Sequence, residues 1–123
     1  MQAQKINPLR RIVNAFRYSC EGYKAAFKDE AAFRQVLLLA IVLVIVAFIL
    51  PLSALERVIL ILPLFVSLIV ELLNSAIENI VDLASPGIHP LAKKAKDMGS
   101  AAQLTALILI VLTWCVVLIG RFL

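Results

Sequence analysis

The chain has 123 residues, of which 63% are hydrophobic, and its mean hydropathy is +1.00. Soluble globular domains contain about 45–50% apolar residues, so this composition excludes an ordinary water-soluble domain and favours a membrane protein. The net charge of +4 comes from basic residues that flank apolar runs and are not interleaved with aromatic residues. That arrangement indicates membrane orientation and anionic lipid, and it argues against nucleic acid as a partner.

Residues 5–28 have the pattern of an amphipathic helix. Apolar side chains such as Ile12, Phe16 and Tyr23 recur at steps of three and four, while basic residues such as Arg17 and Lys24 fill the other face. The pattern predicts a helix that lies in the lipid headgroup region. A soluble helix packed on a partner is the alternative.

Three apolar segments follow. Residues 35–55 hold 21 uncharged residues, and about 20 are needed to cross a bilayer. We therefore predict a first transmembrane helix over residues 32–50, a second over 55–83 with Pro63 as a kink, and a third over 97–120. Residues 84–97 are expected to form a loop. The sequence thus predicts one all-α domain, 1–123, with an N-terminal surface helix and three transmembrane helices.

The distribution of Lys and Arg predicts the orientation. Residues 1–34 carry seven, the turn 51–57 carries one, and the loop 84–97 carries three. The positive-inside rule then places the N-terminus and the second loop in the cytoplasm. The first turn and the C-terminus would face outward.

The second apolar segment carries a polar stripe. An α-helix turns by about 100° per residue, which places the polar side chains within an arc of about 100°. They are Glu71, Asn74, Ser75, Glu78 and Asp82. Glu71 would lie about 10 Å below the cytoplasmic edge of a hydrocarbon layer about 30 Å thick. A carboxylate at that depth costs at least a few kcal/mol unless it is paired, hydrated or protonated, so the stripe predicts a functional site.

Clustered carboxylates at a membrane boundary suit a divalent cation, a proton relay or both. Glu30 precedes the first span at the same predicted depth as Glu78, and these two hard oxygen ligands could share a Mg²⁺ ion. The alternatives are a polar seam that holds helices together and, for Glu30 alone, a solvated charge at a helix N-terminus. The sequence contains no GxxxxGK[ST], GxGxxG or HExxH motif.

Three stretches resemble the signatures of the prokaryotic diacylglycerol kinases. They are Glu71-Leu-Leu-Asn-Ser-Ala-Ile-Glu78-Asn-Ile-Val-Asp82, Ala95-Lys-Asp-Met-Gly-Ser-Ala-Ala102 and Glu30-Ala-Ala-Phe-Arg-Gln35. The resemblance covers nearly the whole chain. It implies a homotrimer of three-span subunits in the bacterial inner membrane, with a periplasmic C-terminus. It also implies transfer of the γ-phosphate of Mg-ATP to the hydroxyl group of a membrane lipid.

The resemblance further implies roles for individual residues. Glu71 would be the general base that takes the hydroxyl proton, and Asn74 would orient Glu71 or a phosphate oxygen. Glu30 and Glu78 would hold Mg²⁺ and contact the nucleotide. The other nucleotide contacts would be Arg11, Tyr18, Lys96 and Asp97. The lipid contacts besides Glu71 would be Ser19 and Ser100.

The chain departs from the family pattern at two positions, and its motifs are compatible with two different lipid substrates. Val36 stands where many members carry Glu, and Cys20 stands where Trp is frequent. The loop His89-Pro-Leu-Ala-Lys-Lys94 resembles the Gram-positive branch, which phosphorylates undecaprenol, whereas Met98-Gly-Ser100 resembles the Gram-negative diacylglycerol branch. We predict a diacylglycerol kinase. An undecaprenol kinase, a small oligomeric proton-coupled transporter built around Glu71, and a structural assembly subunit are the alternatives.

Overall fold

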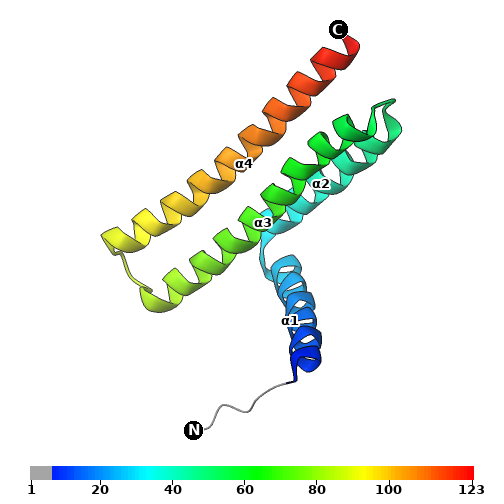
Figure 1. Cartoon of the computed structure of the whole chain (residues 1–123). Coiled ribbons are helices and arrows are strands. Elements are labelled where there is room, and N and C mark those ends of the chain that lie inside the picture. The colour runs from blue at the N-terminus through cyan, green and yellow to red at the C-terminus, as the bar shows by residue number, and fades with distance from the viewer. Residues whose placement is uncertain (1–6) are drawn as a thin grey trace.

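The computed structural model describes residues 7–123, and this part of the chain consists of four α-helices without a strand (Figure 1). They are α1 (Pro8–Asp29), α2 (Ala31–Ile49), α3 (Ala54–Ala84) and α4 (Pro90–Phe122). By length and composition, α2, α3 and α4 are candidate membrane spans. The all-helical prediction with three long apolar segments is therefore confirmed. Lys5 and Ile6, where the surface helix was predicted to begin, lie outside the described residues.

A single residue separates α1 from α2. Glu30 ends α1, with its backbone N–H donating to the carbonyl of Ala26, and it also precedes the first turn of α2. The guanidinium of Arg34 donates to the carbonyls of Phe27, at 2.7 Å, and Lys28, at 3.1 Å. These bonds satisfy the last carbonyls of α1, which have no partner within the helix. The result is a tight elbow, from which α1 points away from the other three helices (Figure 1).

The turn between α2 and α3 is fixed by side-chain hydrogen bonds. Ser53 and Glu56 form a reciprocal capping box at the start of α3, with both bonds at 3.1 Å. Arg57 donates to the carbonyls of Ala47 and Leu50 at the end of α2. The chain therefore reverses direction at Pro51 with its helix ends satisfied.

α3 packs against both α2 and α4. The buried core lies between them and consists of Ala40, Ala47, Leu52, Leu60, Leu64, Ile110 and Trp114. α3 continues through Pro63, and beside it the indole N–H of Trp114 donates to the carbonyl of Leu60 at 3.1 Å. Alanines on α2 have little volume, which lets that helix lie close to α3.

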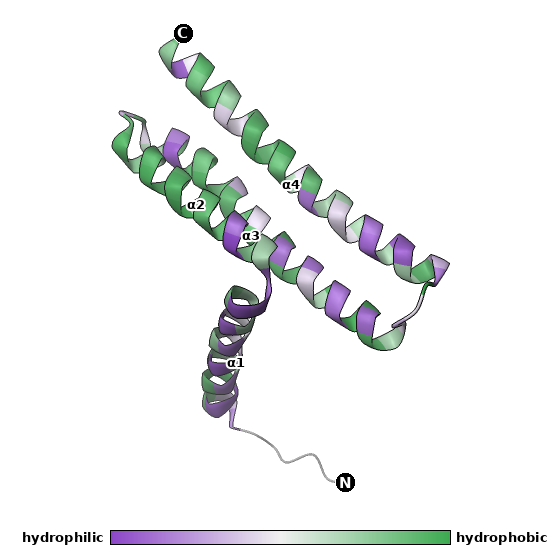
Figure 2. Cartoon of the chain, turned by 180° about the vertical axis from the view of Figure 1, so that it is seen from behind, coloured by the Kyte–Doolittle hydropathy of each residue, from purple (hydrophilic) through white to green (hydrophobic). Residues whose placement is uncertain are grey.

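α3 and α4 are longer than a membrane span requires. They contain 31 and 33 residues, whereas about 20 cross the hydrocarbon layer. Hydrophilic residues on both helices gather toward the loop that connects them, while the middle of α4 and the body of α2 are mostly hydrophobic (Figure 2). Both helices therefore carry polar extensions on the same end of the hairpin.

The start of α4 differs from the prediction. The helix begins at Pro90 rather than at residue 97, so residues 90–97 are helical and the expected loop 84–97 shrinks to residues 85–89. His89 caps the helix, because its Nδ1 accepts a hydrogen bond from the N–H of Leu91 at 3.1 Å. Proline suits the first helical position, since the missing N–H would have no helical partner there. The prediction rested on hydrophobicity, which does not detect a helix that continues into water.

Candidate active site

Glu71 lies in the middle of α3 with only 4% of its surface exposed. Its partner is on α4, where the Nε2 of Gln103 donates to Glu71 Oε2 at 2.9 Å. Gln103 also bonds to Ser67, which lies one turn before Glu71 on the same face of α3. Gln103 and Ser67 were not predicted from the sequence. The signal that could have found Gln103 was a lone amide inside an otherwise apolar run.

Asn74 follows Glu71 on the side of α3 that faces α4. Its Oδ1 is buried and has no hydrogen-bond partner within residues 7–123. This atom lies against Gly99 of α4 so closely that a Cβ at position 99 would overlap it. A buried acceptor without a partner costs about 1–3 kcal/mol. The geometry therefore leaves Asn74 with unused hydrogen-bonding capacity next to Glu71.

The polar stripe continues toward the loop end of α3. Lys96 of α4 forms an ion pair with Asp82, with Nζ and Oδ1 2.5 Å apart. Glu78 is half-buried and lies on α3 between Glu71 and Asp82. A row of charges thus runs from the buried carboxylate of Glu71 to the exposed carboxylate of Asp82. Asp82 was part of the predicted stripe, but its pairing with Lys96 was not foreseen.

Glu30 lies at the α1–α2 elbow, on the other side of α3. Its Oε1 accepts a hydrogen bond from the amide of Asn79 at 3.4 Å. A pocket of about 460 Å³ separates the second half of α1 from α3. Its polar lining consists of Ser19, Tyr23, Asp29, Glu30, Ser75 and Asn79. The structure therefore brings three of the predicted residues, Ser19, Glu30 and Ser75, into one pocket, together with Asn79, which was not predicted from the sequence.

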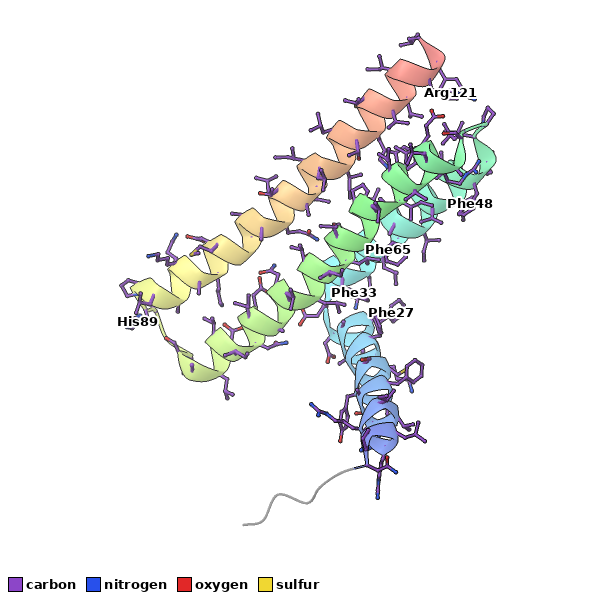
Figure 3. The ribbon with its side chains drawn as sticks, in the orientation of Figure 1. Phe27, Phe33, Phe48, Phe65, His89 and Arg121 are labelled. Atoms are coloured by element: carbon purple, nitrogen blue, oxygen red, sulfur yellow. The ribbon has the colours of Figure 1, made fainter. Side chains whose placement is uncertain are left out.

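The remaining predicted residues lie apart from this row. Arg11, Tyr18 and Ser100 are exposed, and Asp97 pairs with Lys93 at 2.6 Å on the surface of α4. Figure 3 shows α1, with Phe27 beside the elbow, directed away from His89 at the α3–α4 loop. Within residues 7–123, no three metal-ligating side chains come together. One copy of the chain therefore gathers Glu71, Asn74, Glu78 and Lys96 along α3 and α4, but not the predicted contacts of α1.

Comparison with known proteins identifies similar chains. A family model described as prokaryotic diacylglycerol kinase matches residues 17–118. This range includes Glu71, Glu78 and Lys96 and begins after Arg11. A diacylglycerol kinase of Pseudomonas aeruginosa is 56% identical over 112 residues, which are 91% of each chain. One from Helicobacter pylori strain 26695 is 47% identical over 97% of this chain and 89% of its own length. One from Escherichia coli K12 is 46% identical over 91% and 92%, respectively.

Proposed function

The chain belongs to the prokaryotic diacylglycerol kinase family, and we propose that it transfers the γ-phosphate of ATP to the hydroxyl group of diacylglycerol, giving phosphatidic acid. Relatives from three bacteria carry the name diacylglycerol kinase, which favours diacylglycerol over undecaprenol as the lipid. Because the chain belongs to a kinase family, we interpret the acidic stripe on α3 as part of a kinase site rather than of a proton-coupled transporter or a structural assembly subunit.

The observation that carries the proposal is the buried carboxylate of Glu71 on an apolar helix. An isolated carboxylate is expensive at membrane depth, so its retention indicates a chemical use. We propose that Glu71 takes the proton from the lipid hydroxyl. The hydroxyl oxygen then forms a bond to the γ-phosphorus as the bond from that phosphorus to the bridging oxygen of ADP breaks.

The charges beside Glu71 suit the phosphate end of the reaction. Phosphoryl transfer depends on positioning and on neutralising negative charge. We propose that Lys96 exchanges its exposed ion pair with Asp82 for a contact to a phosphate oxygen. Asn74 would use its free Oδ1 and its amide to orient Glu71 or the phosphate. Asp97, Arg11 and Tyr18 would contact the nucleotide.

The half-buried carboxylates of Glu30 and Glu78 fit a Mg²⁺ ion that arrives with ATP. Glu30 Oε1 accepts a hydrogen bond from the amide of Asn79, the residue that follows Glu78 on α3. Mg²⁺ in kinases binds one or two carboxylates together with phosphate oxygens, so the site does not need a third protein ligand. When bound, Mg²⁺ would neutralise charge on the transferring phosphate.

We further propose that the active protein is a homotrimer in the bacterial inner membrane, with sites shared between subunits. Large hydrophobic side chains cover the outward faces of the helices, as with Leu38, Ile45 and Phe48 on α2. The unpartnered Asn74 and the open pocket at Glu30 leave room for groups from a second copy. α1 would lie on the cytoplasmic surface, with Ser19 and Ser100 beside the lipid substrate, and the C-terminus would be periplasmic.

A mixed-micelle assay tests the proposal. The purified protein is given radiolabelled ATP with diacylglycerol or undecaprenol, in the presence and absence of Mg²⁺. We expect Mg²⁺-dependent phosphorylation of diacylglycerol and much slower turnover of undecaprenol. Preferential phosphorylation of undecaprenol would reassign the substrate, and no turnover of either lipid would contradict the kinase proposal. Cross-linking of the protein in membranes reports whether three copies assemble.

A further inference from the structure

We propose that Gln103 is a positioning residue that holds the carboxylate of Glu71 in the orientation needed for proton transfer, with Ser67 fixing Gln103 in turn. The inference deepens the proposed function and rests on it. It assigns a role to two side chains that the sequence signatures of the site do not include.

The three side chains form a closed hydrogen-bonded group between α3 and α4. The Nε2 of Gln103 donates to Glu71 Oε2 at 2.9 Å and to the backbone carbonyl of Ser67 at 3.3 Å. The hydroxyl of Ser67 donates to the Oε1 of Gln103 at 3.2 Å. Ser67 is 0%, Glu71 4% and Gln103 9% exposed. Water therefore has little access to compete for these bonds.

The contacts fix which way the amide of Gln103 faces. If its oxygen and nitrogen were exchanged, the oxygen would face a carboxylate and a carbonyl, both of which only accept hydrogen bonds. The carboxylate of Glu71 and the carbonyl of Ser67 therefore select the orientation that directs N–H groups toward them, and the hydroxyl of Ser67 then donates to the amide oxygen. Because Ser67 and Glu71 lie one turn apart on the same helix, a side chain of α4 can reach both.

The bond from Gln103 distinguishes the two oxygens of Glu71. Oε2 is engaged by the amide, while no side chain of residues 7–123 bonds to Oε1. A carboxylate pinned at one oxygen can rotate little, so the other oxygen keeps a fixed direction in which to accept a proton. General-base catalysis depends on such geometry, since the base must lie within hydrogen-bond distance of the proton it removes.

If the hydrogen bonds among Ser67, Glu71 and Gln103 served only to hold α3 and α4 together, substitutions would affect stability and not kcat. Interhelical bonds of Ser and Gln side chains also hold membrane helices together. The chain provides a matched example in Trp114, whose N–H donates to the carbonyl of Leu60 between the same two helices, three turns along α4 from Gln103. Trp114 does not contact Glu71. Substitution there should affect the packing of α3 on α4 and leave the reaction rate of the folded enzyme alone.

The experiment first establishes wild-type activity in mixed micelles and its loss in Glu71→Gln. It then compares kcat and KM in four variants of the full chain: Gln103→Met, Trp114→Phe, Ser67→Ala and the double variant of Gln103→Met and Ser67→Ala. Gln103→Met keeps the side-chain length and removes the amide. We expect it to lower kcat roughly tenfold or more, because small displacements of a reacting group have effects of this size. The KM values for ATP and diacylglycerol should change less than about threefold, and Trp114→Phe should keep the wild-type kcat.

Ser67→Ala gives a second and milder test, because it removes one oxygen atom and leaves Gln103 in place. It should lower kcat by a smaller factor, and it should have no further effect in the Gln103→Met background, since Ser67 acts through Gln103. Infrared spectra supply a readout other than turnover. The carboxylate bands lost on Glu71→Gln should be shifted in Gln103→Met and unshifted in Trp114→Phe.

Several results would overturn the inference while leaving the proposed function intact. They are a wild-type kcat in Gln103→Met or in Ser67→Ala, an additive loss in the double variant, and unshifted carboxylate bands. If Gln103→Met does not fold, the Ser67→Ala kcat decides the matter. A wild-type protein that phosphorylates neither lipid would contradict the proposed function itself, and the positioning role with it.

Discussion

The two ends of the α3–α4 helix pair differ in how their polar groups are satisfied. Arg121, labelled in Figure 3, lies at the end with the α2–α3 turn. It bonds to Glu56 at 3.4 Å and to the carbonyl of Pro51 at 3.1 Å, and Arg57 donates to carbonyls at the end of α2. At the end with the α3–α4 loop, the carboxylate of the half-buried Glu78 has no hydrogen bond or ion pair to another described residue. Buried Asn74 Oδ1 likewise has none in the described chain.

The difference in unpaired polar groups indicates which end of the helix pair can bind a ligand. Internal bonds at the α2–α3 turn satisfy the groups there, so that end needs nothing further for stability. At the loop end, the chain keeps charged and polar groups that its own fold does not satisfy. Polar groups in or near a membrane are costly unless they are paired, so their retention at one end only points to substrate binding there.

The largest expected effect is that of Glu71→Gln. Removing a general base lowers rates by about 10²–10⁴, whereas the amide of the new side chain can still accept the hydrogen bond from Gln103. We therefore expect kcat to fall by that factor with little change in the thermal unfolding midpoint. Steady-state kinetics and thermal unfolding in detergent measure the two quantities. A kcat within a few-fold of the wild-type value would mean that Glu71 is not the base.

Lys96→Met should have the next largest effect. Loss of a positive charge at the transferring phosphate is expected to lower kcat/KM for ATP by roughly 10². Lys94→Met is the matched control, since it removes the same charge from an exposed position on the same helix. It should change kcat/KM less than about twofold. Equal losses in the two variants would indicate a general effect of surface charge rather than a contact from Lys96.

Gly99→Ala probes how closely α4 approaches Asn74. The added Cβ overlaps Asn74 Oδ1, and overpacking of this kind typically costs about 1–3 kcal/mol in the free energy of unfolding. We also expect activity to fall about tenfold, because either the side chain of Asn74 must turn away or α4, which carries Lys96, must shift.

Gly120→Ala is the control for that variant. A Cβ there meets no atom within 4 Å, and alanine is up to about 1 kcal/mol more favourable than glycine within a helix. It should keep full activity with equal or higher stability. Full activity in Gly99→Ala as well would show that the approach of α4 to Asn74 has no part in the reaction.

The smallest effect is expected at the opposite end. Arg121→Met removes a partly exposed ion pair with Glu56, which is worth at most about 1 kcal/mol in the free energy of unfolding. Turnover should remain at the wild-type level when measured by the same micelle assay. A marked loss of activity would contradict this prediction, since it would show that the end with the α2–α3 turn also contributes to the reaction.

Features that depend on a single helix could be predicted from the sequence. Hydrophobic periodicity and proline placed α1, α2 and α3 within a few residues of their observed bounds, and the polar stripe on α3 follows from helical geometry alone. Gln103 and Gly99 depend on which face of α4 meets α3. That face is set by the packing of residues such as Ile110 and Trp114, which no local pattern reveals. The pairing of Lys96 with Asp82 depends on the same alignment.

The elbow at Glu30 has a mechanical consequence. Because Arg34 bonds the last carbonyls of α1 to the first turn of α2, a change in the angle between these two helices would strain or break those bonds. α1 is about 33 Å long, at about 1.5 Å per residue, so a small change of angle at the elbow would displace its far end by a much larger distance. The bonds of Arg34 therefore restrict the direction of a long helix at the same point where Glu30 meets Asn79 beside the pocket.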